Sequence, residues 1–151
     1  MKDSRFPTLD PLLIGPTRDA LHAYAQVIGS WAEGIRQRRK HWWHISLRPS
    51  LCGLTTGVIH ANINFELELD FRGSALRLAH DNGTGSVNLC GQSAREIARF
   101  VHQQLELAGI EDCRVPRSEE LDDTPHPNYS AQVARDMHVA LAAVAAALEQ
   151  F

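Results

Sequence analysis

The spacing of apolar positions predicts three amphipathic helices, with a block of short strands between the first and the second. Over residues 17–38, apolar side chains recur at i, i+3, i+4 and i+7, the repeat of a helix that buries one stripe. A second helix is predicted over residues 93–109, because Ser93 and Glu96 form a capping box at its start. The third is predicted over residues 130–150, with a narrow apolar stripe of Val133, Met137, Leu141, Val144, Leu148 and Phe151.

Strict alternation of apolar and charged residues marks the clearest strand, at residues 65–72. One of its faces should lie in the core and the other should be polar. Shorter strands are predicted at residues 42–48, 56–60, 75–80 and 86–90. Their short connections imply antiparallel hairpins, because a parallel crossover needs a dozen or more residues. The predicted fold class is therefore α+β: a meandering antiparallel sheet of about five strands packed by helices on one face.

Three prolines distinguish the start of the chain from the rest. Pro7, Pro11 and Pro16 favour an extended conformation, so residues 1–16 are predicted to form an extended N-terminal arm. Residues 17–151 are predicted to form a single α+β domain, because a segment of this length can bury a core of its own.

Composition and charge narrow the classes of partner. Hydrophobic residues make up 44% and charged residues 22% of the chain, and the formal net charge is −3 at pH 7. This charge argues against a general affinity for nucleic acid or anionic membranes. The three cysteines form no Cys-x-x-Cys pair, and neither a signal peptide nor a membrane span is predicted, so we expect a cytoplasmic location. The basic cluster at residues 36–40 is expected to be the solvated end of the first helix.

Several short motifs occur in an order that is specific as a set. They are Thr17, Leu21-His22, Gln26 and Gly29, then His41-Trp42-Trp43-His44, Gly53-Leu54-Thr55-Thr56, Phe65 to Phe71, and finally His126 and Tyr129. From about Thr17 onward the chain resembles a bacterial family catalogued as domain-of-unknown-function family 5996. The resemblance implies no known activity, cofactor or catalytic residue. Many members continue after the last helix, so the resemblance also implies that only their first half is present here.

The first helix carries a polar face that is a candidate ligand site. At 100° per residue, His22, Gln26 and Gly29 share a face that is distinct from the apolar stripe. A glycine inside a helix costs about 0.5–1 kcal/mol relative to alanine, which the close approach of a ligand or a backbone would explain. The alternative is that Gly29 admits a packed strand, while His22 and Gln26 form hydrogen bonds to its edge.

The segment after this helix adds aromatic and titratable side chains. Trp42 and His44 share one parity of the predicted strand, so Trp42 would form a stacking wall and His44 would act as an acid, a base or a hydrogen-bond donor. Thr55 and Thr56 follow closely and would present hydroxyl groups to an anion. The alternatives are an amphipathic surface covered by the N-terminal arm, and two β-branched residues that merely begin a strand.

The carboxylates of the alternating strand can also be interpreted in two ways, as a catalytic group or as a solvated surface. Glu66, Glu68 and Asp70 could do acid–base chemistry, but carboxylates at i, i+2 are commonly a solvated sheet face balanced by arginines. No metal site and no cofactor is predicted, because the histidines have no ligand spacing. His41 and His44, for example, would point to opposite faces of a strand.

Two classes of function follow from these patterns. The first is a small-molecule binding protein or enzyme, with a polar, tryptophan-walled pocket near the first helix and the first strand. In this pocket His22 and His44 should lie within about 10 Å of each other. The second is a protein–protein interaction or self-associating module, such as a homodimer, that uses the C-terminal helix or a sheet edge.

Overall fold

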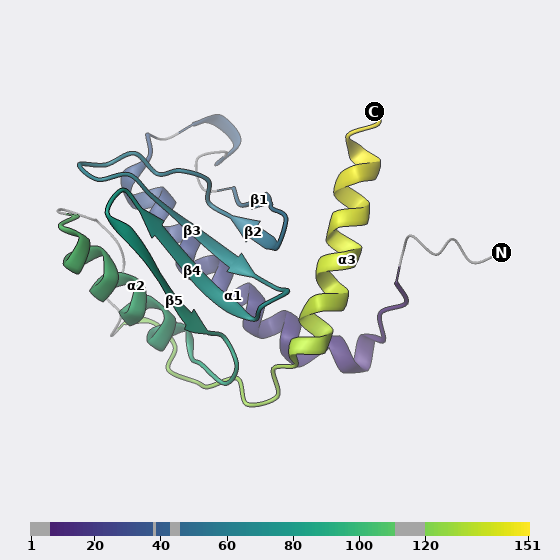
Figure 1. Cartoon of the computed structure of the whole chain (residues 1–151). Helices are drawn as coiled ribbons and strands as arrows, with labels where there is room; N and C mark the ends of the chain where they lie inside the picture. The colour runs from purple at the N-terminus through teal and green to yellow at the C-terminus, as the bar shows by residue number, and fades with distance from the viewer. Residues whose placement is uncertain (1–6, 38, 43–45, 111–119) are drawn as a thin grey trace.

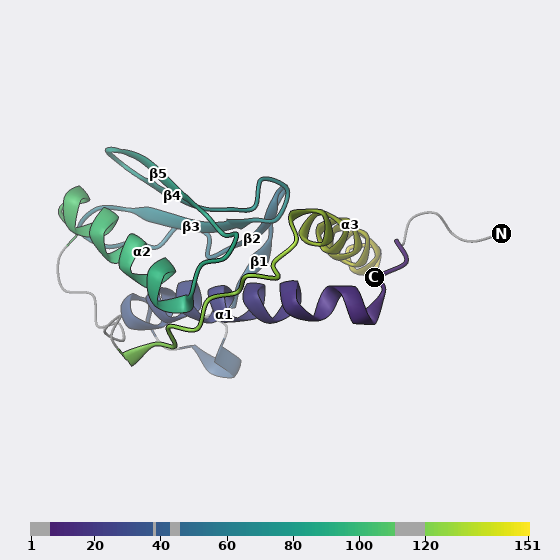
Figure 2. The ribbon, with the colours of Figure 1, turned by 90° about the horizontal axis from the view of Figure 1, so that it is seen from below.

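Two helices cover one face of a five-stranded sheet, and a third helix stands at one end of it (Figures 1 and 2). Figure 1 shows the computed structural model, which describes residues 7–37, 39–42, 46–110 and 120–151. The helices are α1 (Pro11–Ile35), α2 (Ala94–Ala108) and α3 (Ala131–Leu148), with a 3-10 turn, η1 (Lys40–Trp42), after α1. The strands are β1 (Arg48–Pro49), β2 (Gly53–Thr55), β3 (Phe65–Asp70), β4 (Ala75–His80) and β5 (Gly83–Asn88).

The sheet is an antiparallel meander in the order β1-β2-β3-β4-β5, which confirms the predicted α+β fold class. The alternation predicted for β3 is confirmed as well, because its leucines are buried while Glu66 and Glu68 are half-buried on the opposite face. Asp70 shares that face but is buried, and it forms an ion pair with Arg77 of β4 at 2.5 Å. The polar face of β3 is therefore balanced across the strands.

The hydrophobic core lies between the sheet and helices α1 and α2. Ile28 of α1 and Leu67 of β3 are fully buried members of one cluster. Tyr24 of α1 is also fully buried, and its hydroxyl lies 3.0 Å and 2.7 Å from the carbonyl oxygens of Leu89 and Gln92. This contact joins α1 to the segment between β5 and α2.

Helix α2 has the caps that the sequence predicts. The Ser93 hydroxyl accepts a hydrogen bond from the Glu96 amide at 3.1 Å, and the Ser93 amide donates to the Glu96 carboxylate at 2.7 Å. At the other end, Gly109 has a φ of 82° and closes the helix in the left-handed conformation. Both signals are local, which is why the sequence alone predicts them.

Helix α1 begins at Pro11 rather than Thr17, so residues 11–16 do not belong to an extended arm. Asp10 is the N-cap, and its side chain accepts a hydrogen bond from the Leu12 amide at 2.9 Å. Proline is accepted in a first helical turn because those amides have no partner within the helix. Pro16 lies one turn further in and is accommodated inside the helix.

The predicted strand over residues 42–48 is wrong in its first part. Trp42 ends the 3-10 turn η1, and β1 consists of Arg48–Pro49 alone. His41 has a positive φ of 59°, so the chain turns at this point instead of extending. Residues 43–45 lie outside the residues that the structure describes. They include His44, on which the predicted site depends.

Two other strands differ from their predicted bounds. The strand predicted at residues 56–60 is replaced by β2, which ends at Thr55 before the positive φ of Gly57 (64°). Only an isolated bridge between Ile59 and Phe65 remains of it. β5 begins at Gly83, earlier than the predicted residues 86–90, because a two-residue connection is enough to join it to β4.

Helix α3 begins where the sequence predicts, with Ser130 as its N-cap. Its predicted apolar stripe is covered only near the base of the helix. Met137 and Leu141 pack against the core cluster, whereas Val144 and Leu148 are exposed. Figure 1 shows the reason: α3 leaves α1 at its base and runs past the end of the sheet beside β1, so it is not covered by a sheet face as α1 and α2 are.

Candidate functional site

A basic hollow lies where α1 ends, next to β1 and the turn after β2. Its volume is about 620 Å³. It is lined by Ile35, Arg36, Gln37, Arg39, Arg48, Gly57, Val58 and His60. The hollow therefore brings together three arginines and a histidine from three separate segments of a chain whose net charge is −3.

Arg36 is the fixed member of this cluster. It is the C-cap of α1, and its guanidinium donates hydrogen bonds to the carbonyl oxygens of Thr56 at 2.6 Å and Val58 at 3.0 Å. Burial lowers the pKa of Arg36, and repulsion from Arg48 and Arg39 lowers it further. The side chain is thus held in place while two other cations lie close enough to repel it.

The remaining lining residues are more accessible. Arg39 and Arg48 are both exposed at the rim of the hollow. The His60 ring is oriented by Asn64, because its Nδ1 lies 3.0 Å from the Asn64 side-chain oxygen. Guanidinium groups present several N–H donors in one plane, which matches the oxygens of a phosphate or a carboxylate. The arrangement is therefore suited to an anion.

Thr55 and Thr56 lie beside this hollow but do not present free hydroxyls to it. Thr56 is fully buried, and its hydroxyl donates to the Gly57 carbonyl at 2.8 Å. The Thr55 hydroxyl donates to Glu66 at 2.5 Å and accepts from the Gly57 amide at 2.9 Å. Both threonines shape the turn that carries the carbonyl acceptors of Arg36.

His22 and Gln26 are not brought to this hollow. Both side chains are exposed on α1, and ten residues of helix, about 15 Å, separate Gln26 from Arg36. Trp42 immediately follows Lys40 and His41 in η1, close in sequence to Arg39. Because His44 lies outside the described residues, the predicted distance between His22 and His44 stays a prediction.

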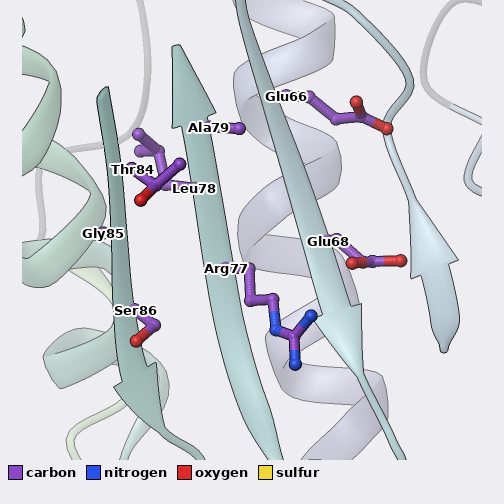
Figure 3. Close-up of a pocket in the computed structure, with 8 residues that line it drawn as sticks. All are labelled: Glu66, Glu68, Arg77, Leu78, Ala79, Thr84, Gly85 and Ser86. Atoms are coloured by element: carbon purple, nitrogen blue, oxygen red, sulfur yellow. The ribbon is translucent and has the colours of Figure 1, made fainter. Parts of the chain in front are cut away.

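A second hollow, of about 690 Å³, lies on the open face of the sheet over β3, β4 and β5 (Figure 3). Its charged residues are already engaged by their neighbours. Glu66 accepts the hydrogen bond from Thr55, and Glu68 accepts one from the Ser50 hydroxyl at 2.6 Å. Arg77 is held in its ion pair with β3. These contacts favour the interpretation of this strand as a balanced, solvated sheet face.

One part of the basic hollow has a signal in the sequence. The basic cluster at residues 36–40 predicts a solvated helix end, and the structure makes Arg36 and Arg39 of this cluster part of the lining. Arg48 and His60 have no local signal, since only the fold places them beside α1. Within the described ranges, no group of three or more histidine, cysteine, aspartate or glutamate side chains could hold a metal ion.

The comparisons with known proteins assign the chain to a family, but they do not assign it an activity. This α+β chain matches the Family of unknown function (DUF5996) over residues 6–151, and it belongs to that family. The match extends the resemblance seen from Thr17 to nearly the whole chain. No curated protein and no solved structure matches it.

Proposed function

We propose that the protein binds a small anionic molecule, one that carries a phosphate or carboxylate group, in the basic hollow at the end of α1. The observation that carries the proposal is the cationic cluster, in which Arg39, Arg48 and His60 line one hollow together with the anchored Arg36. Like charges held together raise the free energy of the folded protein. A bound anion offsets this repulsion, so the site has a physical preference for one.

The three arginines would have different roles in this site. Arg36 supplies a fixed positive charge, because two main-chain carbonyls hold its guanidinium. Arg39 and Arg48 line the same hollow and would donate further hydrogen bonds to the ligand, with His60 beside them. Trp42 follows Arg39 closely in the chain, so we keep it as the stacking wall in this proposal.

Calorimetric titration with inorganic phosphate and with pyrophosphate tests this function. We expect saturable binding of at least one of the two probes by the full chain. Arg48→Gln and Arg39→Gln should each weaken it roughly tenfold, the effect of losing one charge-assisted hydrogen bond. Arg99→Gln removes one positive charge from an exposed position of α2 and is the matched control.

Three outcomes would contradict the proposal. They are no binding of either probe, binding that Arg48→Gln leaves unchanged, and an equal loss in Arg99→Gln, which would indicate only a general charge effect. Thermal unfolding of each variant shows whether the fold is retained. A change in tryptophan fluorescence on binding that Trp42→Phe abolishes and Trp43→Phe leaves in place would support Trp42 as a wall, because Trp31 is buried in the core.

A cytoplasmic setting is the second part of the proposal. Cys52 and Cys90 are free thiols, and Cys90 is exposed, which suits a reducing compartment. Fractionation of cells that express the chain tests this part. Recovery of the protein with membranes or in the secreted fraction would contradict it.

A further inference from the structure

The basic hollow is the first of three adjoining hollows on the surface of the protein. Val58 lines both the basic hollow and a smaller hollow of about 160 Å³. Glu66 and Ala79 line both this smaller hollow and the larger one on the open face of the sheet. Because neighbouring hollows share wall residues, the three follow one another from the end of α1 to β3 and β4. We call them together the long groove.

The register of the sheet places opposite charges along the long groove. Arg48 of β1 pairs with Thr55 of β2, and Thr55 pairs with Glu68 of β3. Residues directly opposite each other in neighbouring strands point to the same face of a sheet. Since each strand spacing is about 4.8 Å, Arg48 and Glu68 are about 10 Å apart along this row. Guanidinium groups therefore lie near one end of the groove and carboxylates near the other.

The carboxylates of β3 do not have equivalent partners. Arg77 lies opposite Glu68 in the register, but its guanidinium forms the ion pair with Asp70. Glu66 and Glu68 are half-buried, and each accepts a hydrogen bond from an uncharged hydroxyl, at 2.5 Å and 2.6 Å. A hydroxyl group orients a carboxylate but does not neutralise it. Among the described residues, charge balance is thus complete at Asp70, while two negative charges remain at Glu66 and Glu68.

Figure 3 shows where these two carboxylates lie. Glu66 and Glu68 project from β3 on the open side of the sheet, and the helices lie behind it. The exposed side chains of Thr84 and Ser86 in β5 line the far wall. The acidic end of the long groove is therefore accessible to a ligand, and neutral hydroxyl groups face the carboxylates across it.

The middle of the long groove offers apolar surface between the two charged ends. Val58 is 48% exposed there, and Ala79 is exposed as well. Two polar residues of the same lining are bonded to each other, because the Asn64 amide donates to the Asp81 carboxylate at 2.9 Å. An aliphatic chain can cross this part without leaving a polar group unpaired. The groove thus runs from cations, over an apolar step, to carboxylates.

Thr55 joins the two charged ends of the groove. Its hydroxyl donates to Glu66 and accepts from the Gly57 amide at 2.9 Å. The carbonyl groups of the residues before and after Gly57 are the ones that hold Arg36. One short turn therefore fixes both Arg36 and Glu66, and with them the spacing between a positive and a negative charge. A fixed spacing favours a ligand that carries both charges, because the site is already organised for it.

We propose that the long groove binds a molecule with an anionic group at one end and a primary ammonium group at the other, joined by an aliphatic spacer. This inference rests on the proposed function, because the anionic group occupies the basic hollow. The ammonium group donates to Glu66 and Glu68, whose carboxylates have acceptor sites besides the one that each hydroxyl uses. The ligand class is that of amine-bearing phosphates or carboxylates with about 10 Å between the charges, the span of two strand spacings.

Calorimetric titration of the full chain with two matched probes tests the inference. The probes are 6-aminohexyl phosphate and hexyl phosphate, which lacks only the amine. We expect the amine to tighten binding roughly tenfold, the effect of one charge-assisted hydrogen bond. In 2-aminoethyl phosphate the spacer is too short to join the two ends, so this compound should bind no better than ethyl phosphate.

Variants of the acidic end assign the effect to its carboxylates. Glu66→Gln and Glu68→Gln should each remove most of the advantage of the amine and leave the Kd of hexyl phosphate within about threefold of its original value. Glutamine keeps an acceptor oxygen for the neighbouring hydroxyl, so the fold should be retained. Glu106→Gln removes a carboxylate from an exposed position of α2 and is the matched control. Circular dichroism shows whether each variant remains folded.

The outcomes separate this inference from the proposed function. Equal affinity for the two hexyl compounds would overturn the inference alone, because anion binding in the basic hollow would still be observed. An equal loss in Glu106→Gln would reduce the advantage of the amine to a general charge effect and would overturn it too. The same gain in 2-aminoethyl phosphate would overturn the spacing. Failure of both hexyl compounds and of inorganic phosphate to bind would overturn the proposed function together with this inference.

Discussion

At the scale of single residues, Tyr24 shows how a polar group is kept in the core. Its ring is fully buried, and its hydroxyl reaches the carbonyls of Leu89 and Gln92. Burial is the largest cause that raises the pKa of Tyr24 above its ordinary value of 10.0, and the nearby Tyr129 adds to the effect. The folded state thus holds the phenolic proton more tightly than the unfolded chain does.

Tyr24→Phe is expected to lower the free energy of unfolding by about 1–2 kcal/mol, because the carbonyls of Leu89 and Gln92 lose a donor. The contribution of Tyr24 is complete below about pH 10 and is lost as the pH rises above it, since only the unfolded chain ionises readily there. Urea unfolding near pH 8 and near pH 11 measures both effects. The variant should lose less stability between the two pH values than the original protein. Equal losses would contradict the assignment to Tyr24.

At the scale of elements, local sequence signals predict helix caps and strand faces, but they do not predict which elements lie side by side. The alternation in β3 and the capping box of α2 are complete within a few residues, and both are confirmed. The predicted start of α1 is wrong because Pro11 is compatible with a first helical turn as well as with an extended chain, and the helix begins there. The basic hollow joins α1, β1 and the turn after β2, which only the sheet pairing brings together.

The pairing of β2 with β3 depends on the absence of a side chain at Gly53. A Cβ atom at this position would overlap the main-chain carbonyl oxygen of Leu69 and crowd the ring of Phe71. Gly53→Ala is therefore expected to lower the free energy of unfolding by about 2–3 kcal/mol. Gly15 in α1 is the matched control, because a Cβ there meets nothing within 4 Å.

Gly15→Ala should raise stability by about 0.5–1 kcal/mol, the helix preference of alanine over glycine. Denaturant unfolding of the two variants side by side measures both changes. A mild effect of Gly53→Ala, comparable in size to that of Gly15→Ala, would show that β2 can shift away from β3 without loss.

At the scale of the whole molecule, the arrangement of the layers explains why the sequence predicts the apolar stripe of α3 but not which of its residues are buried. Period and composition predicted the helix and its stripe correctly, but burial depends on what lies opposite. Figure 2 shows α1 beneath the sheet and α3 at its end, where α3 meets α1 and β1. The inner contacts of Met137 and Leu141 end there. The sequence could name the apolar residues of α3, but it could not predict which of them a neighbour covers.

This arrangement predicts a gradient of stability along α3. At concentrations low enough to keep the protein monomeric, the amides near Ala134 should exchange slowly with deuterium, while those from Val144 to Leu148 should exchange close to the unprotected rate. An isolated helix of this length is marginal in water, so packing at the base has to hold it. Hydrogen exchange measured by mass spectrometry on peptides from α3 tests this, with α2 as an internal reference because five of its residues are buried. Uniform protection along α3 in the dilute monomer would contradict the prediction, because the tip would then be stable without any partner.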